Sequence, residues 1–147
     1  GSWPDPLRGK NDTYWANIVA IQRKAAEGWT LHAEGKTAEG IALLRQAADD
    51  EDATEKSPVT PGPIAPAREL LAELLLESGQ AKAALIEFEK AMTREPGRFR
   101  SIAGAMRAAQ SAGDTAKAKK YAGNLLTLAK AASPGRPEIA EAQKLAK

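Results

Sequence analysis

The chain has 147 residues, of which 43% are hydrophobic, 27% charged and 5% aromatic, a composition that fits one compact domain and excludes a disordered or membrane-inserted chain. With no cysteine and a single histidine, it also excludes disulfide frameworks, thiol nucleophiles, cysteine-rich zinc sites and multi-histidine metal centres. The net charge of +2 conceals an asymmetry, because residues 1–98 carry 12 Lys and Arg against 16 Asp and Glu, and residues 99–147 carry 9 against 3.

Thirty-one alanines favour helices that pack closely through small side chains. Glycine and proline mark the ends of segments whose apolar residues recur every three or four positions, which predicts helices. We expect residues 1–12 to form an N-terminal arm and residues 13–147 to form one helical domain. Its first two helices are predicted at 13–34 and 37–50. Prolines in 53–64 then predict an extended insertion, because proline breaks helices.

Four further helices and a cap follow the insertion. Pro66 suits the first turn of a helix, and Asp114 is a good N-cap. The predicted ranges are 66–78, 80–94, 98–112 and 114–131, with a short solvating cap helix at 137–146. Pairing consecutive helices gives three hairpins, at 13–52, 65–97 and 98–131.

A fixed period relates these hairpins. Gly79 and Gly113 are 34 residues apart, and an alanine follows each of them by five positions. Such a period is typical of stacked helical repeats, which bury their apolar faces against their neighbours. The resemblance is to the tetratricopeptide repeat (TPR), and it is carried by Leu71-Ala72, Leu75, Gly79, Ala84, Phe88, Ala91 and Pro96.

An earlier unit of the same pattern fits the first hairpin, through Gly28, Leu31, Gly35, Gly40, Leu44 and Ala47. Gly35 precedes Gly79 by 44 residues, ten more than the period of 34, and the proline-rich segment accounts for the excess. The order of Asn-Asp-Thr-Tyr-Trp, the acidic run 49–52, Pro-Val-Thr-Pro-Gly-Pro and Arg-Phe-Arg is also similar to the C-terminal part of long bacterial TPR proteins. That narrower resemblance implies a periplasmic or exported parent protein, with a cytoplasmic one as the alternative.

The TPR resemblance implies an all-α, right-handed superhelical stack of three hairpins with a short C-terminal capping helix. TPR arrays bind extended peptides or helices in the concave groove formed by the first helix of each hairpin. A peptide or protein segment is therefore the expected partner. The groove positions implied for this chain are Gln22, Trp29, His32, Glu69, Glu73, Glu77, Arg100, Arg107 and Gln110.

The charged groove positions have two interpretations. Glu69, Glu73 and Glu77 recur every four residues and share one helix face, where like charges repel unless countercharge lies opposite. With Arg100 and Arg107 they form either a solvated surface network worth about 0 to 1 kcal/mol per pair or a surface that reads a partner of mixed charge. Chaperone-binding TPR domains use a carboxylate clamp of Lys and Asn. The corresponding positions here are Ala25, Trp29, Leu70, Gly104 and Arg100, which argues against a chaperone-tail receptor.

Two further features leave alternatives open. Trp29 and His32 lie one helical turn apart and form either part of the core or a stacking platform for a ligand ring. The insertion either folds across the groove as a lip or serves as a structural strut.

Catalytic and metal signatures are lacking. No Ser/His/Asp spacing, phosphate-binding glycine motif or metal motif is present, and the acidic run 49–52 lacks the spacing of a calcium loop. Among the basic residues between 98 and 120, Phe99 is the single interleaved aromatic, so nucleic acid is not an expected partner. The sequence thus predicts a non-catalytic protein-interaction scaffold without cofactor or metal. The alternative is a structural C-terminal capping domain of a longer TPR array, with no ligand of its own.

Overall fold

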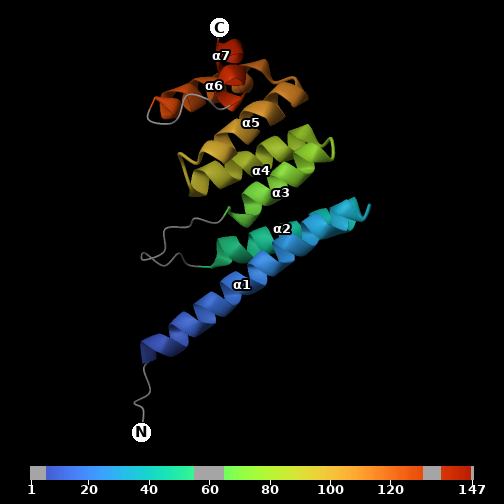
Figure 1. Cartoon of the computed structure of the whole chain (residues 1–147), viewed down its shortest axis with the longest axis vertical. Helices are drawn as coiled ribbons and strands as arrows, with labels where there is room; N and C mark the ends of the chain where they lie inside the picture. The colour runs from blue at the N-terminus through green and yellow to red at the C-terminus, as the bar shows by residue number, and fades with distance from the viewer. Residues whose placement is uncertain (1–5, 55–64, 131–136, 147) are drawn as a thin grey trace. The chain divides into compact units, whose positions relative to one another are not determined.

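A computed structural model of the chain describes residues 6–54, 65–130 and 137–146, with side chains from residue 13 onward. Helices are the only regular elements in these ranges, as the all-α prediction requires (Figure 1). They are α1 (Pro6–Ala33), α2 (Thr37–Ala53), α3 (Ala67–Glu77), α4 (Ala81–Arg94), α5 (Phe99–Ala112), α6 (Thr115–Ala129) and α7 (Pro137–Ala146).

The first helix begins earlier than expected. α1 starts at Pro6, so residues 6–12 are helical and do not form the arm predicted for 1–12. Proline suits this position, because the first turn of a helix leaves its N–H groups without intrahelical partners. Residues 55–64 of the insertion are outside the described residues, and so the lip and the strut expected there remain predictions.

The chain divides into two compact units, residues 1–67 (unit 1) and residues 68–147 (unit 2). This differs from the single domain expected over 13–147. Unit 1 contains the first hairpin, whereas unit 2 contains nearly all of the second hairpin, the third hairpin and the cap. The extra ten residues of the insertion fall between the first and second hairpins, where a regular array would continue without interruption.

One turn geometry recurs in all three hairpins. Gly35, Gly79 and Gly113 have φ values of 85°, 86° and 80°, in the left-handed region that only glycine adopts readily. In each turn the glycine N–H donates to the carbonyl three residues earlier, and the next N–H donates to the carbonyl five residues earlier, over 2.8–3.2 Å. These bonds satisfy the last carbonyls of the first helix and reverse the chain. The glycine spacing seen in the sequence therefore corresponds to a repeated helix-ending turn.

Unit 1 is a hairpin of α1 and α2 held by small side chains. Leu44, Ala47 and Ala48 of α2 are fully buried, and Ile21 and Ala25 of α1 are almost so. α1 extends well beyond α2 at its N-terminal end (Figure 1). Trp15 and Val19 of α1 are 51% and 43% exposed.

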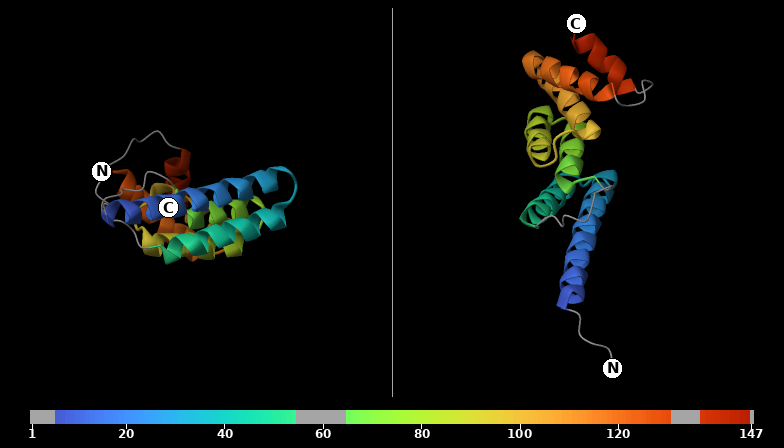
Figure 2. Two further views of the ribbon diagram at one scale, coloured as in Figure 1. Left: turned by 90° about the horizontal axis from the view of Figure 1, so that it is seen from below. Right: turned by 90° about the vertical axis from the view of Figure 1, so that its left-hand side faces the viewer.

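Unit 2 stacks two hairpins and a cap, which follow one another in Figure 2. Its core is formed mainly by Leu71, Leu74, Leu75, Phe88, Met106 and Leu125, all at most 1% exposed. Glu89 of α4 accepts bonds from Lys117 (3.0 Å) and Tyr121 (2.5 Å) of α6, which ties together the second helices of the two hairpins. The buried side chains of α7 are Ile139 and Ala142. The two hairpins of unit 2 are thus stacked one after the other, as the TPR pattern implies. The right-handed superhelix of three hairpins remains a prediction.

Candidate functional site

Unit 2 contains a hollow of about 620 Å³ on the first helices of its two hairpins. Its walls come mainly from α3 and α5, with one contribution each from α4 and α7. The lining residues are Glu73, Leu76, Glu77, Phe88, Phe99, Arg100, Ala103, Gly104, Arg107 and Glu138. Four of these, Glu73, Glu77, Arg100 and Arg107, were expected from the sequence to line the groove.

The floor of the hollow is apolar because Gly104 has no side chain. A Cβ at position 104 would lie 2.3 Å from Cε1 and Cζ of Phe88, so the glycine lets the Phe88 ring pack directly under the α5 backbone. Phe88 is fully buried, whereas Leu76 and Phe99 are only partly buried. These two side chains give the hollow accessible apolar surface.

One side of the rim is the ion pair of Glu73 and Arg100, which joins α3 to α5. Nη2 of Arg100 lies 2.8 Å from Oε1 and 2.9 Å from Oε2 of the glutamate. Burial raises the pKa of Glu73, against the lowering effect of Arg100, and the nearby carboxylate of Glu69 raises it further. The effect of burial on this pKa thus outweighs that of Arg100.

A second pair joins α5 to the cap helix. Arg107 donates to both carboxylate oxygens of Glu141, at 2.9 Å from Nε and 2.8 Å from Nη2, and lies 3.7 Å from Glu138. The hydrogen bonds from Arg107 lower the pKa of Glu141, and the same bonds raise the pKa of Arg107. The bidentate geometry holds α7 against the rim of the hollow.

Glu69 is placed differently from the expectation. It is 0% exposed and accepts two bonds of 3.2 Å from Arg98 and one of 2.5 Å from the Ser101 hydroxyl. Hydrogen bonding to Glu69 raises the pKa of Arg98. α5 and its N-cap residue cover this carboxylate. Glu69 is therefore a structural residue and does not line the hollow.

The other expected positions lie outside the hollow. Gln110 is exposed near the C-terminal end of α5. Gln22, Trp29 and His32 belong to α1 of unit 1. There the Trp29 and His32 rings meet edge to face at 5.9 Å, and His32 Nδ1 lies 2.9 Å from the Thr37 hydroxyl. Trp29 is partly buried, and its Nε1 is a buried donor without a hydrogen-bond partner among the described residues.

Sequence reasoning missed several residues of the hollow, including Leu76, Phe99, Ala103 and Glu138. The sequence did contain a signal for some of them. Phe99, Ala103 and Arg107 follow one another at four-residue spacing, which places them on one face of α5. Glu138 and Glu141 lie on the cap helix, outside the repeat pattern, and no repeat position pointed to them.

Among residues 6–54, 65–130 and 137–146, no group of three or more His, Asp or Glu side chains is arranged to hold a metal ion. In the same ranges, none of the helices has the length and hydropathy needed to cross a bilayer.

Comparison with known proteins supports the fold. No protein-family model and no curated protein matches the chain. Among solved structures, it is similar to the second TPR domain of human RPAP3, determined by NMR in complex with the HSP70 peptide SGPTIEEVD. The TM-score is 0.64 at 18% sequence identity, over 86% of this chain and 98% of that chain. The chain thus has a TPR-like fold, and its narrower resemblance to bacterial TPR proteins remains a prediction.

Proposed function

We propose that this protein is a non-catalytic interaction scaffold that binds a peptide or protein segment in the hollow on α3, α5 and α7. The observation that carries the proposal is the combination of an apolar floor with a charged rim. Leu76 and Phe99 offer accessible apolar surface, and the ion pairs around Arg100 and Arg107 border it. Recognition sites on proteins commonly combine such a floor with a few placed polar groups.

The comparison is consistent with this proposal. The RPAP3 domain of similar fold holds a peptide, and 98% of that domain is covered by the match. Catalysis has little support, because the carboxylates at the hollow are ion-paired with Arg100 or Arg107, or lie on an exposed helix end. Proton transfer would require an unpaired acid or base in a cleft that excludes water.

A capping role is the second candidate, and α7 favours it. Ile139 and Ala142 are buried, whereas Ala140, Gln143 and Lys144 are exposed. A helix with one apolar and one polar face is what a terminal repeat needs for solubility. If the protein has this capping role, the hollow has no ligand of its own.

Selection from a random peptide library displayed on phage separates the two functions. A scaffold retains peptides that bind the wild type and fail to bind Leu76→Ser, which removes an apolar wall of the hollow. The matched control is Ile86→Ser, because Ile86 is 54% exposed on α4 and does not line the hollow. Far-UV circular dichroism and the melting temperature establish that both variants are folded.

The outcomes are distinct. Peptides lost on Leu76→Ser and kept on Ile86→Ser support the groove. Failure to select any peptide, or equal binding by both variants, contradicts the proposal and leaves the capping role. Alanine substitution of Gln22, Trp29, His32 and Gln110 then tests whether the ligand extends beyond the hollow.

A further inference from the structure

We infer that an apolar face of α1, formed by Trp15, Ala16, Val19 and Ala20, binds a second copy of this chain and makes the protein a reversible dimer. The inference does not depend on the proposed function, because it concerns unit 1 and not the hollow of unit 2. It is carried by the lack of charge in this part of α1, by the exposure of its large apolar side chains and by their order along the helix.

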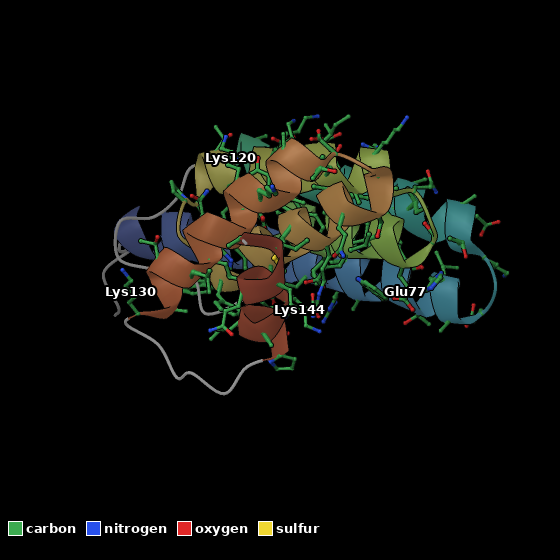
Figure 3. The ribbon with its side chains drawn as sticks, turned by 90° about the horizontal axis from the view of Figure 1, so that it is seen from above. Glu77, Lys120, Lys130 and Lys144 are labelled. Carbon is green, nitrogen blue, oxygen red and sulfur yellow. The ribbon has the colours of Figure 1, made fainter. Side chains whose placement is uncertain are left out.

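Residues 13–22 form a stretch of α1 without a charged side chain. Their sequence, TYWANIVAIQ, contains seven apolar residues among ten. A helix that is apolar on nearly all sides is normally buried. In unit 2 the exposed faces of α6 and α7 carry charge instead, through Lys120, Lys130 and Lys144 (Figure 3). The composition of residues 13–22 therefore indicates a surface that a partner covers.

The first hairpin does not cover this stretch by itself. Ile21 is buried, but no side chain from residue 13 to residue 20 is buried. Trp15 and Val19 are 51% and 43% exposed, and the neighbouring Ala16 and Ala20 are exposed as well. Contiguous exposed apolar side chains mark sites of interaction on soluble proteins.

The order of the side chains on the apolar face of α1 is self-complementary. Large and small residues alternate as Trp15, Ala16, Val19 and Ala20, within an arc of about 140° around the helix. We place two antiparallel copies about a two-fold axis midway between residues 17 and 18. Trp15 then lies level with Ala20 of the second copy, and Val19 lies level with Ala16 of the second copy. A two-fold interface requires a surface that complements itself in this way.

The same features favour a second copy over a membrane surface. A helix that lies in a bilayer interface combines its apolar face with a strongly charged polar face. Residues 13–22 provide no charge for such a face. A second copy brings no like charges together at this stretch, and the alanines allow the two helices to approach closely.

The expected association is weak. The apolar face of α1 spans about two helical turns, so it buries less than the roughly 800 Å² per partner of a standard stable interface. We therefore expect a dissociation constant on the order of 100 μM. Sedimentation velocity between about 10 μM and about 1 mM protein is expected to show a shift from monomer to dimer.

Two substitutions test the apolar face of α1. Trp15→Glu is expected to raise the dissociation constant about tenfold or more, because it places a carboxylate inside the contact. Ala20→Trp adds apolar surface but places a second large ring level with Trp15, so it is also expected to weaken the dimer. The matched control is Ile86→Glu, because Ile86 is 54% exposed on α4 of unit 2. Circular dichroism and the melting temperature establish that each variant is folded.

Disulfide cross-linking tests the register, because the chain has no cysteine of its own. The proposed axis places the two copies of residue 16 about 4.5 Å apart along the helix direction, and the two copies of residue 26 about 25 Å apart. Ala16→Cys is therefore expected to form an intermolecular disulfide under mild oxidation. The control Ala26→Cys, at another exposed alanine of α1, is expected to remain uncross-linked.

Each measurement has an outcome that overturns the inference. A wild type that remains monomeric up to about 1 mM does so, whether or not it then cosediments with phosphatidylcholine vesicles. Equal dimerisation of Trp15→Glu and the wild type, or equal cross-linking of the two cysteine variants, also overturns it. Stronger association of Ala20→Trp would show non-specific apolar contact in place of the proposed pairing. None of these outcomes bears on the peptide site of unit 2.

Discussion

The backbone of Gly28 occupies the place where a side chain of Gly40 would stand. A Cβ at position 40 would lie 2.4 Å from the carbonyl oxygen of Gly28, and a Cβ at position 28 would lie 2.9 Å from the carbonyl oxygen of Gly40. Both glycines are buried between α1 and α2. The first hairpin therefore packs backbone against backbone at this crossing.

Gly40→Ala is expected to destabilise this hairpin by about 1–3 kcal/mol, the usual cost of overpacking, in spite of the better helix propensity of alanine. The three tryptophans, Trp3, Trp15 and Trp29, all belong to unit 1. Urea unfolding followed by tryptophan fluorescence therefore reports on unit 1.

The matched control is Gly123→Ala in α6, where an added Cβ meets nothing within 4 Å. It is expected to leave stability unchanged or to raise it by up to about 1 kcal/mol, measured by far-UV circular dichroism. An unfolding midpoint of Gly40→Ala equal to that of the wild type would contradict the close packing.

The helices and their turns were predictable because their signals are local. Gly79 and Gly113 end their helices through bonds within five residues, and the 34-residue spacing follows directly from the chain. The start of α1 was missed because the residues between Pro6 and Thr13 give no apolar period. Pro6, which suits the first turn of a helix, was the local signal for that start.

The local sequence pattern did not predict how deeply each site residue is buried. Four-residue spacing places Glu69, Glu73 and Glu77 on one face of α3, yet the first is buried, the second partly buried and the third exposed. The difference arises because Arg98 and Ser101, 29 and 32 residues later in the chain, cover Glu69. Tertiary partners at such separations leave no mark in the local pattern.

The buried carboxylate of Glu69 gives a second prediction. Glu69→Ala leaves the Ser101 hydroxyl and the Arg98 guanidinium without their shared partner, so a loss of about 3 kcal/mol is expected. Arg100→Ala breaks a pair whose arginine side chain is 59% exposed, and is expected to cost about 0–1 kcal/mol. Urea unfolding by far-UV circular dichroism measures both. Equal losses would contradict the distinction between structural and surface pairs.

Trp29 gives a third prediction, which separates packing from binding. Trp29→Phe keeps most of the ring and removes the buried Nε1 donor, so its unfolding free energy is expected to stay within about 1 kcal/mol of the wild type. Trp29→Ala is expected to cost about 3 kcal/mol, because the ring contacts are lost. Circular dichroism in urea measures both. If Trp29→Ala instead abolishes peptide binding at unchanged stability, Trp29 is a ligand contact.

The carboxylates of Glu141 and Glu73 are expected to titrate on opposite sides of the ordinary glutamate value. Hydrogen bonds from Arg107 lower the pKa of Glu141, whereas burial raises the pKa of Glu73. The pH dependence of the side-chain carboxyl ¹³C chemical shifts measures both values directly. Arg107→Gln should return the pKa of Glu141 toward the ordinary value and leave that of Glu73 unchanged. A Glu141 value at or above that of Glu73 would contradict the pairing.

The two shifts affect stability with opposite signs. The pKa of Glu141 is lower in the folded state, so its contribution is fully present above the unfolded value of about 4.3 and is lost as the pH falls through the folded value. Glu141→Gln should therefore weaken the α7 contact at neutral pH, and the variant and wild type should converge in acid. The pKa of Glu73 is higher in the folded state, so its favourable contribution is present below the unfolded value and is lost as the pH rises through the folded one.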